Sequence, residues 1–427
     1  MTSLISPLGG TDRVFSGPGA FATAWRERTG IGSPGAVPLG ARLVTLGDSI
    51  TAHAFQQNNP QDRGYSASGF VFWFLQGLGH RLRVPHNGNL AVSGNTLQQI
   101  RDSLGAGGAT VRALAPDVVS FLGGTNNLND TFADGQLTAL LDQSLDLLLG
   151  ATAAQILLWT IPPRPAAVPL STEGERQRLA LNAHLAARAA ARTDRITLVD
   201  LDDVGLGAGD FSDNVHPNAS GARKIGLAGA ARFVGKVAAG SIAAVPPLAA
   251  YTLNPTLSGG STVAPSWSTT LAAGSATVAF TKDENDRQRI LISGSYAGTA
   301  GRISLDQYTT VAAVGSGPPD GAEIDALLDY EIVGTPVGIN AIGVLGQTGT
   351  AGYANLAQAQ SCLGDYANDL TPGGPGSYLS RAIGVAKGAG TPHFLTTRLL
   401  ITFIDRPVAG PVSLDLRVNS LAFRRIG

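Results

Sequence analysis

The chain has 427 residues, more than a single hydrophobic core usually organises, so its length favours two domains. Only 14% of the residues are charged and the formal net charge is −1, without the basic stripe that a phosphate backbone requires. We therefore expect no nucleic-acid partner. The one cysteine, Cys362, excludes an internal disulfide and a cysteine-rich metal site, and we expect a small buried side chain there.

Residues 1–39 are rich in glycine and proline and carry no basic start or continuous apolar stretch of the kind found in secretory signals. We expect them to form an arm or tether. The longest apolar run, residues 147–163, is interrupted by Gly150, Gln155 and paired prolines, so we expect no membrane span. The sequence leaves the cellular location open.

Between residues 42 and 240, short β-like runs alternate with helical ones. This rhythm predicts crossover connections and a parallel sheet, so residues 40–242 are expected to form an α/β three-layer sandwich. The predicted strands are residues 42–48, 89–94, 117–124, 155–161 and 196–201. The predicted helices are residues 68–77, 96–104, 136–149, 173–191 and 219–238.

The helical pattern stops after Lys236, and the next charged residue is Lys282. Prolines and glycines predict a linker at residues 243–258. Beyond it, residues 259–427 show short runs of alternating apolar and polar residues, separated by Gly, Pro and Asp. This pattern predicts a second domain, an all-β antiparallel sandwich or jelly roll.

A Gly-Asp-Ser turn ends the first predicted strand and places Ser49 at its carboxyl end. Ligands of open parallel sheets bind at this edge, where the loops converge. A serine hydroxyl becomes a nucleophile only when a base takes its proton and donors hold the oxyanion formed by its attack. The charge of Asp48 would oppose that oxyanion, so we expect Asp48 to fix the turn.

Other predicted strand ends carry suitable partners for this serine. Gly94 follows the second strand, Gly124 and Asn126 follow the third, and Asp213 and His216 follow the fifth. An imidazole is a suitable acid and base near neutral pH, and Asp213 could accept a hydrogen bond from its Nδ1. Pro217 and Asn218 would then end this loop and start the last helix.

These four blocks resemble those of the SGNH hydrolases, also called GDSL esterases and lipases, over about residues 40–240. The resemblance implies that Ser49 is the nucleophile, His216 the general base and acid, and Asp213 its orienting carboxylate. It also implies an oxyanion hole formed by the N–H groups of Ser49 and Gly94 and by the side-chain amide of Asn126. No metal or organic cofactor is expected.

One position departs from the family pattern. The third block usually reads Gly-x-Asn-Asp, whereas Asn127 replaces the aspartate here. The preceding asparagine supplies the oxyanion donor, so the departure questions the support of the loop more than the chemistry.

Each block also has a structural explanation. Gly-Asp-Ser is a common turn, His216 could be a surface loop residue, the glycines could serve only positive φ, and Asn126 could only close a turn. The catalytic interpretation rests on the order and placement of the blocks. The other histidines show no metal-ligand spacing with one another, and we expect structural or surface roles for them: His53, His80, His86, His184 and His393. His53 could instead line the pocket, because it lies four residues after Ser49. No Gly-x-Ser-x-Gly elbow occurs, which argues against the other common serine-esterase fold.

The substrate is predicted from weaker features. The loop after the serine contains amides and an aromatic ring, and we single out Gln56 and Tyr65 as substrate-binding residues. These residues would suit a hydroxyl-rich ligand, or they could simply form a solvated loop. A β-sandwich beside such a hydrolase resembles a carbohydrate-binding accessory domain, so we expect an acylated glycan, or another ester, as substrate and removal of O-acetyl groups as the reaction.

Two alternatives stay open. The chain would suit a phage tail or spike protein that binds surface glycan, forms a homo-oligomer such as a trimer, and docks on the virion through its arm. A purely structural role is the other alternative.

Overall fold

A computed structural model describes residues 36–53, 69–128, 135–165, 167–299, 301–319, 321–351, 355–361, 374–380, 383–385 and 392–426. The predicted arm (except residues 36–39), Gln56, Tyr65 and Cys362 lie outside these residues. Val37–Gly427 form one compact unit, and the boundaries at residues 242 and 258 stay predictions. Among the described helices, none combines the length and the apolar character needed to cross a bilayer.

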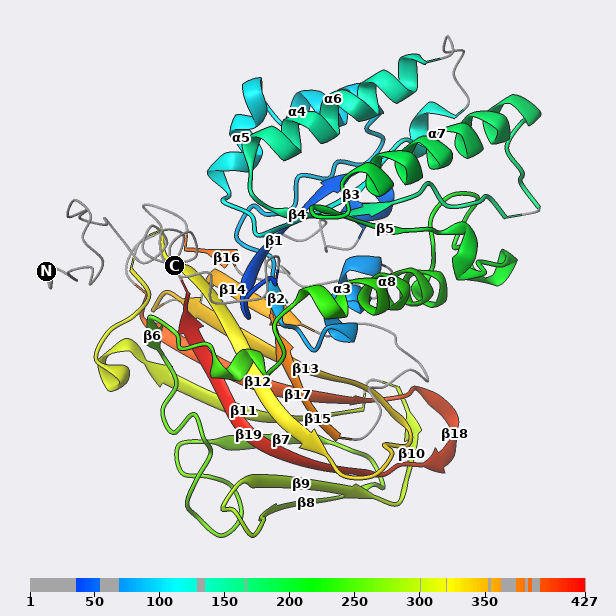
Figure 1. Ribbon diagram of the computed structural model, residues 1–427. Coiled ribbons are helices and arrows are strands. Elements are labelled where there is room, and N and C mark those ends of the chain that lie inside the picture. The colour runs from blue at the N-terminus through cyan, green and yellow to red at the C-terminus, as the bar shows by residue number, and fades with distance from the viewer. Residues whose placement is uncertain are drawn as a thin grey trace, which may run out of the picture. The chain divides into compact units, whose positions relative to one another are not determined.

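The first part of this unit is a parallel sheet of five strands in the order β2-β1-β3-β4-β5 (Figure 1). Its strands are β1 (Ala41–Gly47), β2 (Leu82–Arg83), β3 (Val118–Leu122), β4 (Gln155–Trp159) and β5 (Ile196–Val199). The residues of β3 and β4 are buried throughout, as expected for strands covered by helices on both faces. The predicted three-layer α/β sandwich is confirmed.

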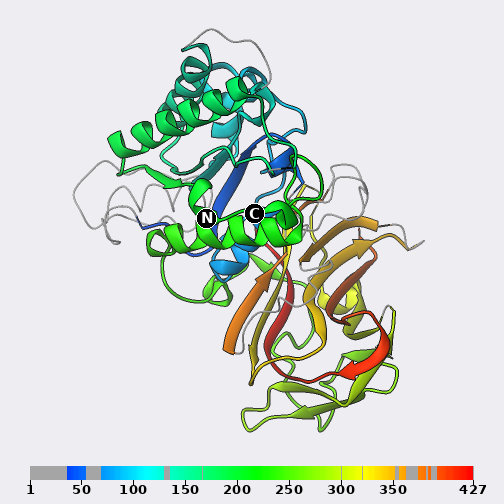
Figure 2. The same cartoon turned by 90° about the vertical axis from the view of Figure 1, so that its right-hand side faces the viewer.

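Helices cover both faces of this sheet, as Figures 1 and 2 show. The main helices are α3 (Phe70–Gly77), α4 (Leu97–Ser103), α5 (Ala109–Ala113), α6 (Gln136–Ala151), α7 (Thr172–Ala191) and α8 (Ala219–Phe233). Successive residues of a strand point to opposite faces, so Leu157 packs with Phe233 of α8 in one core cluster. Its neighbour Leu158 packs with Leu141 of α6 in the other.

The second strand differs from the prediction. Residues 89–94 were expected to form it, but the assigned strand β2 is earlier, and only Asn89 bridges to Thr45 of β1. A turn at Pro85, whose carbonyl accepts a hydrogen bond from the Gly88 N–H, separates the two pieces. The predicted segment still runs beside β1, because the Val92 N–H donates to Gly47 O.

The second part is antiparallel and forms a β-sandwich, whose sheets Figure 2 shows as separate layers. One sheet has the order β14-β13-β17-β11-β7, namely Asn355–Ser361, Ile339–Gly349, Phe394–Phe403, Arg302–Thr310 and Ser268–Ala272. The other has the path β15-β12-β19-β9-β8, namely Gly374–Leu379, Glu323–Ile332, Leu414–Arg425, Gln288–Ser293 and Thr277–Lys282. Two short strands pair with the second sheet, β6 (Ala249–Ala250) with β19 and β16 (Ile383–Gly384) with β12. A separate two-stranded sheet is formed by β10 (Ser295–Gly298) and β18 (Arg406–Pro411).

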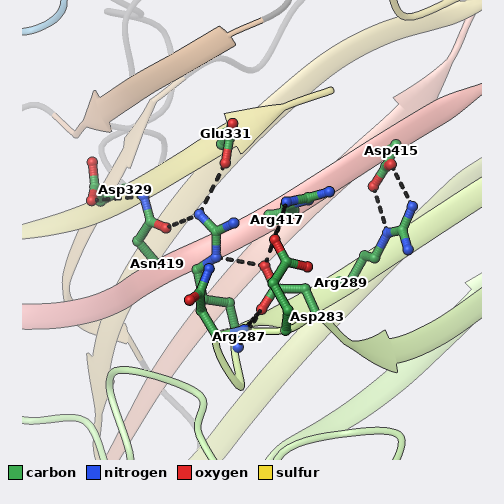
Figure 3. Close-up of polar contacts among 10 residues, drawn as sticks. Asp283, Arg287, Arg289, Asp329, Glu331, Asp415, Arg417 and Asn419 are labelled. Carbon is green, nitrogen blue, oxygen red and sulfur yellow. Dashed lines mark hydrogen bonds and ion pairs between the residues drawn. The ribbon is translucent and has the colours of Figure 1, made fainter. Parts of the chain in front are cut away.

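A charged network joins the turn between β8 and β9 to two strands of the second sheet, β12 and β19 (Figure 3). Arg287, in the turn between β8 and β9, donates from Nε to Asp283 at 2.6 Å. Its Nη1 donates to Glu331 of β12 at 2.9 Å and to Asn419 of β19 at 3.0 Å. Burial raises the pKa of Asp283, but hydrogen bonds from the backbone N–H groups of Arg287 and Asn285 and from the Arg287 side chain outweigh it and lower the pKa.

We expect Arg287→Met to lower the free energy of unfolding by about 2–3 kcal/mol at neutral pH, because the buried Asp283 carboxylate loses its nearest cation and keeps only two backbone N–H donors and Arg417 at 3.8 Å. The Asp283 side chain is 0% exposed and that of Arg287 is 21% exposed. An aspartate whose pKa is lower in the folded than in the unfolded protein stabilises the fold at pH values above its unfolded pKa. This contribution is lost as the pH falls through the pKa of the folded protein. The difference from the wild type, measured by urea unfolding, should therefore shrink below about pH 4.

The control for this prediction is Arg289→Met. Arg289 also pairs across strands, with Asp415 of β19 at 2.7 Å, but these side chains are 32% and 17% exposed. We expect it to cost about 1 kcal/mol or less. Equal losses of unfolding free energy in the two variants would show that the burial of Asp283 does not increase the cost of removing its arginine partner.

Candidate active site

Ser49 lies at the carboxyl end of β1 as the first residue of the short helix α2 (Ser49–Ala52). Asp48 caps this helix, because its Oδ1 accepts a hydrogen bond from the Ile50 N–H at 3.1 Å, and this confirms the predicted turn-fixing role. The N–H of a first helical residue has no acceptor within the helix. The turn therefore offers a hydroxyl and a backbone donor at one place.

Asp48 is fully buried beside the serine. Burial raises its pKa to about 6, although the Ile50 N–H, the charge of His216 and Thr125 all act to lower it. The carboxyl group therefore takes up a proton in the mildly acidic range.

His216 and Asp213 lie in a tight loop between β5 and α8. The loop is closed by a bridge between Phe211 and Pro217, and Asn218 caps α8 by accepting hydrogen bonds from its first N–H groups, as predicted. Asp213 Oδ1 accepts hydrogen bonds from the N–H groups of Val215 and His216, both at 2.7 Å. The loop backbone thus holds the carboxylate in place.

The structure brings Ser49, His216 and Asp213 into one hydrogen-bonded line. His216 Nε2 lies 2.8 Å from Ser49 Oγ, and its Nδ1 lies 2.7 Å from Asp213 Oδ2. Burial raises the pKa of Asp213, but hydrogen bonds from the His216 side chain and from the His216 and Val215 backbone outweigh it and lower the pKa to about 2. Near neutral pH the carboxylate is ionised and can accept the Nδ1–H hydrogen bond that leaves Nε2 facing the serine.

Two of the three predicted oxyanion residues, Gly94 and Asn126, lie on loops that contact each other. Asn126 Nδ2 donates a hydrogen bond to the backbone oxygen of Asn95 at 3.0 Å, and Asn95 directly follows Gly94. Gly94 has a φ of +83°, which favours glycine, and no heavy atom lies within 4 Å of the place a Cβ would occupy. Gly124 has a φ of +113°, and a Cβ there would lie 2.8 Å from Ile161 Cδ1. The role of these groups as oxyanion donors stays a prediction.

The departure at Asn127 is compatible with loop support. Its side chain is 1% exposed, and its Oδ1 accepts a hydrogen bond from the Leu97 N–H at 2.9 Å. An amide oxygen thus makes a contact that a carboxylate could also make. It ties the loop after β3 to the first turn of α4.

His53 contacts the catalytic candidate directly. The centroids of the His53 and His216 rings are 4.5 Å apart, with an interplanar angle of 36°. Burial, followed by the charge of His216, lowers the pKa of His53, while Asp213 acts to raise it. The interpretation that His53 could line the pocket is therefore compatible with its position.

One residue of the site escaped the sequence analysis. Arg164 follows β4, and its Nη1 donates to Asn214 O, within the loop that carries Asp213 and His216, at 2.9 Å. The signal available was its position after a predicted strand, at the edge where the other site residues lie. Within the described residues, no group of three His, Cys, Asp or Glu side chains is placed to hold a metal ion.

Comparisons with known proteins match the first part of the chain. Residues 45–224 match the model of the GDSL-like lipase/acylhydrolase family. A search of curated proteins finds no match. Among solved structures, Axe2, an acetylxylan esterase from Geobacillus stearothermophilus, is 21% identical, with coverage of 47% of this chain and 96% of that chain and a TM-score of 0.37.

Two further solved structures are similar to parts of the chain. A member of the lipolytic protein G-D-S-L family from Veillonella parvula is 17% identical, with coverage of 45% of this chain and 96% of that chain and a TM-score of 0.34. The enzymatically active domain of tailspike protein 4 from bacteriophage CBA120 is 8% identical, with coverage of 38% and 20% and a TM-score of 0.26.

Proposed function

Residues 45–224 belong to the GDSL-like lipase/acylhydrolase family, and we propose that they form a serine esterase that removes O-acetyl groups from a polysaccharide. The observation that carries this proposal is the contact of 2.8 Å between Ser49 Oγ and His216 Nε2, with Asp213 on the far side of the imidazole. This arrangement has the geometry that activates a serine for attack on an ester.

The proposed reaction has two halves. Ser49 Oγ attacks the ester carbonyl while His216 Nε2 takes its proton, and the imidazolium then gives that proton to the departing alcohol. His216 next takes a proton from water, whose oxygen attacks the acyl-serine, and the acid leaves as Ser49 regains its hydrogen. The Asp213 carboxylate holds the imidazole in the required tautomer throughout.

The oxyanion formed in each half needs hydrogen-bond donors. The N–H groups of Ser49 and Gly94 and the Asn126 amide are the proposed donors. Asn126 uses one amide hydrogen for Asn95 O, and its amide carries a second. The bond to Asn95 fixes the amide before substrate arrives, and such preorganisation gives a donor its effect.

We expect Asn126→Ala to lower kcat by about 10²–10³-fold on a short-chain aryl ester, with a much smaller change in KM, because the lost donor acts on the transition state. The matched control is Asn285→Ala, an exposed asparagine in the β8–β9 turn. An unchanged kcat in Asn126→Ala would remove this side chain from the oxyanion hole.

The polysaccharide part of the proposal is supported by the second part of the chain. A β-sandwich on the same polypeptide would raise the local concentration of a repeating polymer if it binds that polymer. On the sandwich, Tyr308 is 52% exposed and its ring stacks on Phe394, with the ring centroids 5.2 Å apart. Such a ring presents a flat apolar face with a polar tip, which suits the face of a sugar.

The test is acetate release from a panel of O-acetylated polysaccharides, with deacetylated polymers and the Ser49→Ala variant as controls. We expect release from at least one polymer that depends on Ser49. Binding of the Tyr308→Ala variant to the same polymers would be measured separately. Binding without Ser49-dependent release would instead support the glycan-binding alternative, and release only from small aryl esters would contradict the polysaccharide assignment.

A further inference from the structure

The segment that follows β4 is firmly attached to α7. The Ile161 N–H donates to Asn182 Oδ1 at 2.8 Å, and Ile161 O accepts from Asn182 Nδ2 at 3.0 Å and from Arg178 Nη1 at 3.1 Å. Both backbone polar groups of Ile161 are therefore bound by buried side chains. The next residues are Pro162 and Pro163, whose rings fix φ. Arg164 thus extends from a rigid base.

The Arg164 side chain reaches the loop that carries the catalytic candidates. Its Nη1 donates to Asn214 O at 2.9 Å, and Asn214 lies directly after Asp213. The base of this loop is closed by the bridge between Phe211 and Pro217. Asn214 is exposed at the tip of this loop, and Arg164 contacts it from the segment after β4, in addition to the contacts that Ser49 and His53 make with His216.

The charge of Arg164 acts on the same groups. Burial lowers the pKa of Arg164, while the negative charges of Asp213 and Asp48 act to raise it. The guanidinium is therefore a half-buried cation in the field of the carboxylate that orients His216. A cation there stabilises the ionised form of Asp213, which is the form that accepts the Nδ1–H hydrogen bond.

We propose that Arg164 is a positioning residue of the esterase, whose guanidinium holds the tip of the Asp213–His216 loop so that the imidazole stays aligned with Ser49. This inference rests on the proposed function. It assigns to a residue outside the triad the task of keeping the distance between Ser49 Oγ and His216 Nε2 short. A misplacement of reacting groups by about 1 Å is enough to lower a rate by roughly 10²-fold.

The experiment compares Arg164→Ala and Arg164→Lys with the wild type and with Arg176→Ala. Arg176 is an exposed arginine of α7 that pairs with Glu173 and serves as the matched control. Two rates are measured: kcat and KM on a short-chain aryl ester, and the rate at which a fluorophosphonate labels Ser49. Labelling reports the activation of the serine whatever the natural ester is.

We expect Arg164→Ala to lower kcat and the labelling rate together by roughly 10–100-fold, with KM nearly unchanged. Arg164→Lys should recover part of both rates, and added guanidine should partly rescue Arg164→Ala. A general loss of structure would not be rescued by guanidine. Arg176→Ala should behave as the wild type.

Other results would overturn the proposal. Equal labelling of Ser49 in the wild type and in Arg164→Ala would show that Arg164 does not position the base, while the esterase assignment would stand. A rise in KM alone would make Arg164 a substrate contact instead. A wild type that fluorophosphonate does not label at Ser49 would overturn the esterase assignment itself, and this inference with it.

Discussion

Replacing Ser49 by alanine is expected to lower kcat on any ester substrate by about 10⁴-fold or more, because no other group of the proposed site can form the acyl intermediate. The variant should still fold, since the change removes one oxygen atom and leaves the Asp48 cap on Ile50 intact. The measurement is steady-state hydrolysis of a short-chain aryl ester, with circular dichroism to confirm the fold.

A second serine provides the control for this variant. Ser275 is exposed in a turn of the β-sandwich, and its Oγ donates to Ser295 O at 2.9 Å. Ser275→Ala should keep full activity. If Ser49→Ala retains wild-type turnover while the wild type is active, the nucleophile lies elsewhere and the proposed mechanism fails.

Replacing Asp213 by asparagine is expected to lower kcat by about 10³–10⁴-fold at neutral pH. The carboxylate accepts a hydrogen bond from His216 Nδ1 and also from two backbone N–H groups of its loop. An amide can keep some of these contacts, but its NH₂ group would favour the tautomer in which Nδ1 accepts, and Nε2 would then point a proton at Ser49. The loss should therefore appear in kcat.

The pH dependence of the wild-type rate distinguishes the loss of the correct His216 tautomer from a loss of activity through protonation of Asp213. The pKa of Asp213 is lowered to about 2, so in the wild type the carboxylate stays ionised throughout the mildly acidic range. An acid limb of the rate profile is then not due to Asp213. The matched control is Asp203→Asn, an exposed carboxylate after β5 that should not affect kcat at any pH. Similar losses in the two variants would contradict the orienting role of Asp213.

Much of the fold follows from local patterns. Buried strands such as β3 and β4 are nearly continuous apolar runs, which is typical of parallel strands that helices cover on both faces. The edge strand was placed wrongly, because β2 has only two residues and Pro85 interrupts the segment. A strand of two residues is too short to show an alternating pattern, so the apolar residues after the turn at Pro85 favoured a strand at residues 89–94 instead.

The residues of the candidate site that lie directly after strands could be predicted from the sequence. Ser49, Asn126 and His216 each follow a strand of the parallel sheet, and the carboxyl ends of such strands share one edge. The contacts of His53 and Arg164 depend on how loops fold over that edge, and no local pattern carries this information. Gln56 and Tyr65 lie outside the described residues, so their assignment stays a prediction.

The separation of Ser49 and His216 by 167 positions has a consequence for how the protein matures. His216 leaves the ribosome long after Ser49, the proposed nucleophile, and folds that depend on contacts between such distant segments form slowly. Hydrolytic competence would thus lag behind the recovery of helical circular dichroism during renaturation from urea. Hydrolysis of a fluorogenic ester would then report when the tertiary structure is complete, whereas circular dichroism would report only the earlier formation of helices.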